Sequence, residues 1–166
     1  MVIGFFEPND WLSNMYPVTI KITAPSSLQI HPFTENLISK DTLLYGSVEN
    51  AYQAAKFYDQ HFNYASIVGT MEPHKTKAFV RQYSAFVRSD WESIKEKVML
   101  HLLRLKFDKP LFQAKLKMTK GLILEANGWH DNFWGSCFCS RCRGQGKNIL
   151  GQLIMQIRNE IVNERI

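Results

Sequence analysis

The first residues whose types and spacing suggest chemistry are Glu49 and Lys56. Ser47 precedes a run of apolar residues at helical spacing, so it is placed to cap a helix with Glu49 in its first turn. The free N–H groups and the dipole of a helix N-terminus favour a carboxylate, which could act as a general base toward water or stabilise a developing cation. Lys56 lies two turns along the same face. A glutamate in a first turn is also a common helix-stabilising choice, and Lys56 could be a solvated surface lysine.

A second stretch combines an aromatic loop with a glycine-rich turn. Residues 129–135 (WHDNFWG) contain Asp131 and Trp134, and residues 144–151 (GQGKNILG) open a helix. Glycines let backbone N–H groups approach a phosphate, and a helix N-terminus favours its charge. Trp134 offers a ring face for a base or a ribose. The spacing matches neither a Walker A loop nor a Rossmann fingerprint, and the glycines could only form a sharp turn beside core tryptophans.

All three cysteines lie between these two stretches, at Cys137, Cys139 and Cys142. Three thiolates this close could hold a structural zinc ion, with His130 as a conceivable fourth ligand. Such sites usually come from paired cysteine knuckles, and the sequence has no second pair. A redox-sensitive cluster and a loop without metal are the alternatives. A catalytic Cys–His pair has less support, because no pattern singles out one nucleophile.

The elements that must position these residues are mostly helices. Runs of β-branched and aromatic residues predict strands at residues 2–6, 17–23, 42–45 and 122–126. Apolar residues at helical spacing predict helices over residues 47–62, from Ser89 as cap, over 110–119 and from Asn148 onward. Residues 24–41 are interpreted as a long excursion, such as a hairpin arm. We therefore expect an α+β fold, mostly helical, with a small and mainly antiparallel sheet from the N-terminal third.

Composition bounds the class of protein. The chain has 166 residues with 45% hydrophobic and 21% charged residues, which predicts one globular domain over residues 1–166. No apolar run is long enough for a membrane helix, the N-terminal residues do not resemble a secretory signal, and three clustered cysteines exclude a disulfide framework. We therefore expect a cytoplasmic location and no membrane partner. The net charge of +5 is dispersed, and the one loose basic cluster comprises Lys75, Lys77, Arg81 and Arg88.

The order of these stretches resembles the YbiA-like, or NADAR, family, and the matches span nearly the whole chain. An early aromatic pair, Phe5-Phe6, is followed by Leu12-Ser13-Asn14 and by residues 47–57 (SVENAYQAAKF). The remaining matches are Trp91-Glu92-Ser93-Ile94-Lys95 with Val98-Met99, Asp131-x-x-Trp134-Gly135, and Gly146-x-Asn148-x-Leu150-Gly151-x-x-Ile154-Met155-x-x-Arg158. Each element is weak alone, whereas the ordered set is specific.

The resemblance implies an N-glycosidase for small-molecule phosphoribosyl or ADP-ribosyl N-glycosides that requires no cofactor. Bacterial YbiA-type proteins cleave early riboflavin-pathway intermediates, and other members act in ADP-ribose chemistry, including removal of ADP-ribose from nucleobases. The family's catalytic glutamate falls on Glu49, and its ligand-contacting aspartate falls on Asp131, which could share the catalytic work or bind ribose hydroxyls. The implied substrate-binding residues are Ser13, Asn14, Lys56, Trp91, Trp134, Gly135, Gly146, Lys147 and Asn148.

Elementary chemistry agrees with this assignment. Breaking a C–N glycosidic bond builds positive charge on the ribose, which a nearby carboxylate stabilises while it orients or deprotonates the attacking water. Lys56 and the turn at residues 144–148 would neutralise a phosphate. Trp91 or Trp134 would stack on the departing base or wall off water.

The chain departs from the short YbiA version at residues 136–143, where the cysteines replace a compact turn. This insert could alter substrate choice or add a zinc-supported lid. One alternative function is a non-catalytic module that binds NAD or ADP-ribose. Another is a hydrolase that takes ADP-ribose from nucleic-acid bases, for which Lys75, Lys77, Arg81 and Arg88 would have to form a contiguous basic face.

Overall fold

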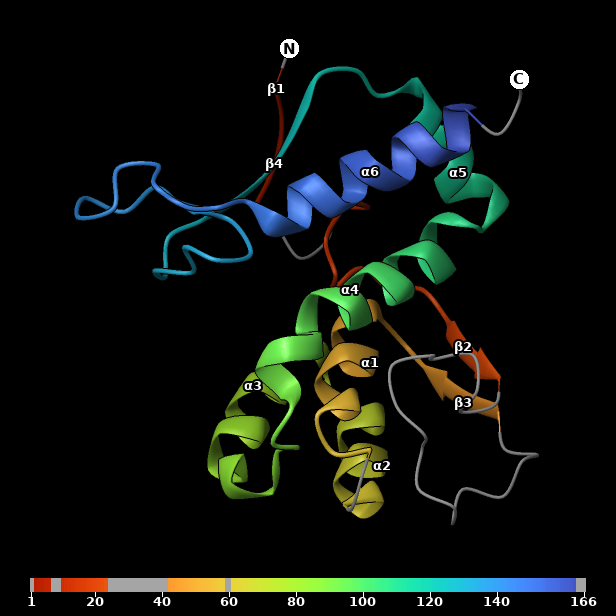
Figure 1. The fold of residues 1–166 in the computed structure, drawn as a ribbon, viewed down its shortest axis with the longest axis vertical. Coiled ribbons are helices and arrows are strands. Elements are labelled where there is room, and N and C mark those ends of the chain that lie inside the picture. Colours follow the sequence, from red (N-terminus) through yellow and green to blue (C-terminus); the bar gives the residue numbers. More distant parts are fainter. Residues whose placement is uncertain (1, 7–9, 24–41, 59–60, 164–166) are drawn as a thin grey trace. The chain divides into compact units, whose positions relative to one another are not determined.

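The computed structural model describes residues 2–6, 10–23, 42–58 and 61–163 (Figure 1). The chain folds into two compact units. Unit 2 is the continuous segment of residues 14–106, whereas unit 1 combines residues 1–13 with residues 107–166. The expectation of one domain over residues 1–166 stays a prediction.

Unit 2 is built around helix α1, Val48–Ala55, whose eight residues are all buried. This helix packs against α2 (Phe62–Thr70), α3 (Pro73–Gln82) and strand β3 (Thr42–Tyr45). Strand β3 pairs in antiparallel fashion with β2 (Ile20–Thr23). A short 3-10 turn, η2 (Ser84–Phe86), precedes the long helix α4 (Trp91–Phe107).

The start of α1 is fixed by the predicted cap. Ser47 Oγ accepts a hydrogen bond from the backbone N–H of Asn50 over 3.1 Å. The Asn50 amide donates in turn to the carbonyls of Val68 and Met71, at 2.9 and 2.8 Å, and so ties the first turn of α1 to the end of α2. A local capping rule therefore determines where the first turn begins, and long-range hydrogen bonds hold it in place.

Unit 1 contains a three-stranded sheet of order β1-β4-β5. Strand β4 (Leu122–Asn127) lies at the centre and pairs in parallel with both β1 (Val2–Phe5) and the short β5 (Ser136–Cys137). Helix α6 (Ile149–Asn163) packs on β4 and also contacts α5 (Pro110–Met118). Gly151 permits this approach, because a Cβ atom there would overlap the carbonyl oxygen of Ile123.

The predicted α+β class with small sheets is confirmed, and the described residues form six α-helices. The antiparallel pairing expected for the N-terminal third holds for β2 and β3. The sheet that contains β1 is parallel instead, because β1 pairs with β4 from the far end of the chain. The excursion predicted at residues 24–41 lies outside the described residues. Among the residues that are described, none of the helices combines the length and apolar character that crossing a membrane needs.

Candidate functional site

Glu49 lies in the first turn of α1, where the sequence predicts it. Its backbone N–H donates to the carbonyl oxygen of Asn14 over 2.9 Å, and its side chain is buried at 4% exposure. A carboxylate at this position faces the partial positive charge of the helix N-terminus. Asn14, a predicted binding residue, therefore lies directly beside the predicted catalytic residue.

Gln53 is a neighbour of Glu49 that the sequence analysis missed. One turn further along α1, its Nε2 donates to Glu49 Oε1 over 2.9 Å. The other amide atom, Gln53 Oε1, is buried, as is Asn14 Oδ1, and neither has a hydrogen-bond partner within the described part of the chain. Buried acceptors are normally satisfied, so these two oxygens are suited to receive donors from a ligand. The i, i+4 spacing from Glu49 is the signal that could have found Gln53.

Lys56 closes α1 beside two aromatic rings. Its Nζ lies 5.5 Å from the centre of the Tyr52 ring and 5.4 Å from that of Trp91. Burial lowers the pKa of the Lys56 ammonium from 10.5 to about 8, and the negative charge of Glu49 opposes that shift. An amine with this pKa is mostly charged at neutral pH and close to its titration point. It can therefore meet an anion or give up a proton under mild conditions.

Trp91 begins α4 and faces α1. Its ring meets the Tyr52 ring edge to face, with centroids 4.9 Å apart. The segment before it is held by the Arg88 N–H, which donates to the Lys56 carbonyl over 2.9 Å, and by a two-pronged pair of Arg88 with Asp90 at 2.6 and 2.9 Å. Unit 2 thus brings together four of the predicted site residues, which with Gln53 and Tyr52 form the α1 cluster: Asn14, Glu49, Tyr52, Gln53, Lys56 and Trp91.

Asp131 belongs to unit 1 and organises the loop after β4. Its Oδ1 accepts from the backbone N–H groups of Phe133 and Trp134, at 3.2 and 2.9 Å. The buried side chain of Asn127 holds the same loop, because its Nδ2 donates to the Asp131 carbonyl over 2.8 Å and its Oδ1 accepts from the Asp131 N–H over 3.2 Å. Asp131 therefore shapes the turn that carries Trp134, and its predicted catalytic role stays a prediction.

Four N–H groups at the start of α6, those of residues 147–150, are not free to bind a phosphate. The N–H groups of residues 147–150 donate instead to the carbonyls of residues 132–135, over 2.8 to 3.2 Å. Gly135 and Gly146 make this contact possible, since a Cβ on Gly146 would overlap the Gly135 carbonyl oxygen. The exposed Lys147 side chain, with Nζ 5.4 Å from the Phe133 ring centre, is the cationic group that this turn offers.

Both polar atoms of the Asn148 side-chain amide form hydrogen bonds to the backbone of β4. Its Oδ1 accepts from the Glu125 N–H over 3.0 Å and its Nδ2 donates to the Ile123 carbonyl over 2.8 Å. The residue adopts a left-handed backbone with φ of 52°. These bonds position the start of α6 on β4, and the predicted contact of Asn148 with substrate stays a prediction. Ser13, the remaining predicted residue, lies in a unit 1 turn where its N–H donates to the Asp10 carbonyl over 2.8 Å.

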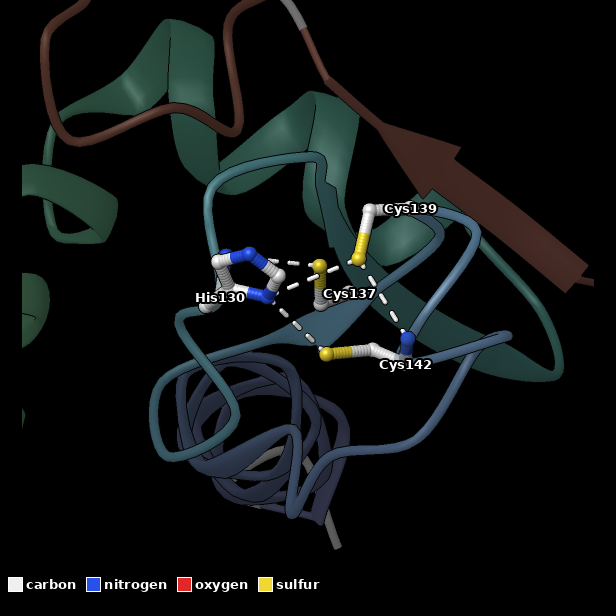
Figure 2. Close-up of side chains that lie close together, drawn as sticks. All are labelled: His130, Cys137, Cys139 and Cys142. Atoms are coloured by element: carbon white, nitrogen blue, oxygen red, sulfur yellow. Dashed lines mark hydrogen bonds between the residues drawn. The ribbon is translucent and has the colours of Figure 1, made fainter.

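The three cysteines and His130 form a cluster in unit 1, as Figure 2 shows. The three sulfur atoms and one imidazole nitrogen all lie within 4.8 Å of one another. Cys137 and Cys142 are buried, Cys139 is half-buried and His130 is exposed. The backbone N–H of Cys142 lies 3.3 Å from Cys139 Sγ and lowers the pKa of the Cys139 thiol. The arrangement has the donor types of a Cys₃His metal site.

The chain is similar to known proteins in both sequence and structure. A family model described as the NADAR domain matches residues 5–162. N-glycosidase YbiA of Escherichia coli (strain K12) is 32% identical over 129 residues, which cover 77% of this chain and 78% of that protein. The chloroplastic riboflavin biosynthesis protein PYRR of Arabidopsis thaliana is 38% identical over 89 residues, 53% of this chain but only 14% of that protein. An NMR structure of E. coli YbiA matches with a TM-score of 0.70 at 26% identity, covering 99% of this chain and 87% of that one.

Proposed function

Because this chain belongs to the NADAR domain family, we propose that it is an N-glycosidase that hydrolyses the C–N bond of phosphoribosyl or ADP-ribosyl N-glycosides. The relatives named N-glycosidase YbiA and riboflavin biosynthesis protein PYRR support the reaction class. The observation that carries the proposal is the buried carboxylate of Glu49, held at a helix N-terminus by Gln53. We place this activity in the cytoplasm, because the three free cysteines of this chain would stay reduced there.

Cleavage of the C–N glycosidic bond is favoured by a fixed negative charge beside the ribose. As the C–N bond breaks, positive charge develops on the sugar ring, and a preorganised carboxylate stabilises that state more than it stabilises the substrate. The Gln53 amide occupies Glu49 Oε1 and fixes the plane of the carboxylate. The second oxygen, Oε2, would then accept a proton from the attacking water.

Lys56, Trp91 and Asn14 supply the binding contacts in this proposal. The Lys56 ammonium would pair with a substrate phosphate, and the buried Trp91 ring would wall off water beside the base. The buried acceptors Asn14 Oδ1 and Gln53 Oε1 would receive hydrogen bonds from ribose hydroxyls. Asp131 is proposed as a second catalytic carboxylate, and Trp134 and Lys147 as further binding residues of unit 1.

A product assay on the full chain tests the reaction. The protein would be offered ribosylamino-pyrimidine phosphates, NAD, ADP-ribose and ADP-ribosylated DNA, with the released base and sugar identified by mass spectrometry. We expect cleavage of at least one substrate and loss of about 100-fold or more in kcat for Glu49→Gln. Glu96→Gln is the control, because Glu96 is an exposed glutamate on α4. Equal activity of wild type and Glu49→Gln would reject the catalytic assignment.

Two alternatives are outcomes of the same assay. ADP-ribose binding without turnover would identify a non-catalytic NAD or ADP-ribose module. Cleavage of ADP-ribosylated DNA alone would identify a nucleic-acid substrate. The predicted basic face for nucleic acid is reduced in the structure, because Arg88 is buried and paired with Asp90, while Lys75, Lys77 and Arg81 remain exposed on α3.

A further inference from the structure

The loop cluster of unit 1 has the geometry of a site for a single metal ion. We propose that Cys137 Sγ, Cys139 Sγ, Cys142 Sγ and His130 Nδ1 bind one structural Zn²⁺ ion. A tetrahedral ion with bonds of about 2.3 Å to sulfur holds neighbouring ligand atoms about 3.8 Å apart. The four atoms lie within 4.8 Å of one another, so a small inward movement of side chains completes the coordination.

The imidazole already points at the sulfur atoms through one nitrogen. His130 Nδ1 lies 3.2 Å from Cys142 Sγ and 3.5 Å from Cys139 Sγ (Figure 2). His130 has a φ of 67°, in the left-handed region that only a few per cent of non-glycine residues adopt. A backbone held in such a conformation requires compensation from its surroundings, and a bond from Nδ1 to zinc would supply it.

Each sulfur also receives one N–H group. The His130 N–H donates to Cys137 Sγ over 3.3 Å, the Cys142 N–H to Cys139 Sγ over 3.3 Å, and Asn132 Nδ2 to Cys142 Sγ over 3.5 Å. Thiols are weak acceptors, whereas metal-bound thiolates carry negative charge that such donors stabilise. One donor for each of three sulfurs is the environment expected for bound thiolates rather than for free thiols.

The chain between the ligands is folded to keep them together. The N–H of Arg143 donates to the Cys139 carbonyl over 2.9 Å, and that of Gly144 to the Cys137 carbonyl over 2.7 Å. Both residues have positive φ, 51° for Arg143 and 84° for Gly144. This tight reversal places Cys139 and Cys142 on the same side as Cys137, which β5 anchors against β4.

Four protein ligands fill a tetrahedral ion, so the proposed zinc is structural and leaves no position for substrate. On binding, the three thiols release their protons and the thiolates and neutral imidazole coordinate the ion. The ion would join the loop of residues 128–135 to the turn of residues 138–146. Asp131 is the next residue after His130 and Trp134 lies on the same loop, so the zinc would fix the loop that carries both.

Metal content tests the proposal directly. The full chain would be purified under reducing conditions without a histidine tag and analysed for metals by mass spectrometry. We expect about one zinc ion per chain, and strong loss of zinc in Cys139→Ser and Cys142→Ser. Ser140→Ala is the matched control, since Ser140 lies on the same loop and is exposed. Wild-type protein without zinc, with iron in its place, or with a disulfide in its intact mass would overturn the proposal.

Cobalt substitution identifies the ligands even if a cysteine variant does not fold. Wild type loaded with Co²⁺ should show a sulfur-to-cobalt charge-transfer band and the visible bands of a tetrahedral ion. His130→Cys should retain the metal with stronger charge transfer, whereas His130→Ala should change the visible bands. Identical spectra for wild type, His130→Cys and His130→Ala would exclude His130 as a ligand.

Hydrogen exchange tests the positioning role independently of activity. Zinc removal with a chelator and reductant should increase amide exchange in residues 128–147 and leave α1 in unit 2 unchanged. Restored protection on adding Zn²⁺ is expected. Unchanged exchange in residues 128–147 after full zinc removal would contradict a positioning role.

Discussion

The Nε2 of Gln53 donates to Oε1 of Glu49 over 2.9 Å within the first two turns of α1. Both side chains are buried, and the pair shares one helix, so its geometry does not depend on the placement of any loop. A carboxylate fixed in this way has lost much of its rotational freedom before any substrate arrives. Gln53 therefore acts as a positioning residue for Glu49.

Replacing Gln53 with Met should lower kcat by about 10-fold or more, because the carboxylate plane is released while the side-chain volume is kept. The change in kcat should exceed the change in KM. Steady-state kinetics with a substrate that the product assay shows to be cleaved measure both. Gln156→Met, at an exposed glutamine of α6, is the control and should have wild-type kinetics. Wild-type kcat in Gln53→Met would show that Glu49 needs no such support.

The lowered pKa of Lys56 predicts that catalysis depends on pH. Its pKa of about 8 lies below 10.5 because burial disfavours the charged form, so the ammonium is lost as pH rises through 8. We expect kcat/KM for a phosphate-bearing substrate to fall about tenfold per unit above that pH, since substrate phosphate is already fully ionised there. Lys56→Arg should remove this decline, because arginine stays charged. A flat wild-type profile up to pH 9.5 would argue against phosphate binding by Lys56.

The same lysine should reduce stability at neutral pH. Below pH 8 the folded protein must bury a charge that the unfolded chain solvates, and between about 8 and 10.5 this cost disappears as folded Lys56 deprotonates first. Lys56→Met is therefore expected to raise the free energy of unfolding at pH 7 by on the order of 1–2 kcal/mol. Urea unfolding at pH 7 and pH 10 measures this gain, which should shrink at the higher pH. Substrate cleavage should be impaired in this more stable variant.

Asn148 should contribute to stability through both atoms of its amide. Asn148→Gly keeps the left-handed backbone but removes the bonds to the Glu125 N–H and the Ile123 carbonyl, so we expect a loss of about 1–3 kcal/mol. Asn148→Ala should cost roughly a further 1 kcal/mol, because alanine disfavours that conformation. Asn159→Ala, at an exposed position of α6, is the control. Thermal unfolding measures the stability of the variants, and equal stability of Asn148→Gly and Asn159→Ala would contradict this role.

Gly151 should tolerate no side chain. A Cβ there would overlap the Ile123 carbonyl and lie within 2.6 Å of both atoms of the Asn148 amide, all groups that the fold holds fixed. We expect Gly151→Ala to destabilise the protein by about 3 kcal/mol or more. Gly4→Ala on β1 is the control, since a Cβ at Gly4 meets nothing within 4 Å. Denaturant unfolding of both variants compares the two sites, and equal midpoints would contradict the packing of α6 on β4.

The sequence predicts best what depends on neighbouring residues. The Ser47 cap and the first turn with Glu49 were predicted correctly, because a cap needs only residues a few positions apart. The helix predicted over residues 47–62 ends at Ala55, and α4 begins at Trp91 rather than directly after Ser89. Helices α2 and α3 and strand β5 were not predicted.

The remaining errors concern partners far apart in the sequence. The pairing of β1 with β4 joins Val2 to Leu122, and no local pattern specifies it. The glycine-rich turn was interpreted as a phosphate cradle from its composition alone. The N–H groups of residues 147–150 donate instead to the carbonyls of residues 132–135, which composition does not reveal. The sequence left zinc binding, a redox-sensitive cluster and a loop without metal as alternatives for the close cysteines, because spacing alone does not show that His130 lies beside them.

The pairing of β1 with β4 also sets an order of events at the ribosome. Strand β1 is synthesised before unit 2, yet its partner β4 follows only after the whole of unit 2, residues 14–106, has emerged. At ordinary rates of translation, this delay is on the order of ten seconds. Unit 2 is continuous and can fold during that time, whereas β1 must wait without a partner. A stalled or truncated product ending near residue 106 would therefore carry an unpaired strand edge, the kind of segment that chaperones bind.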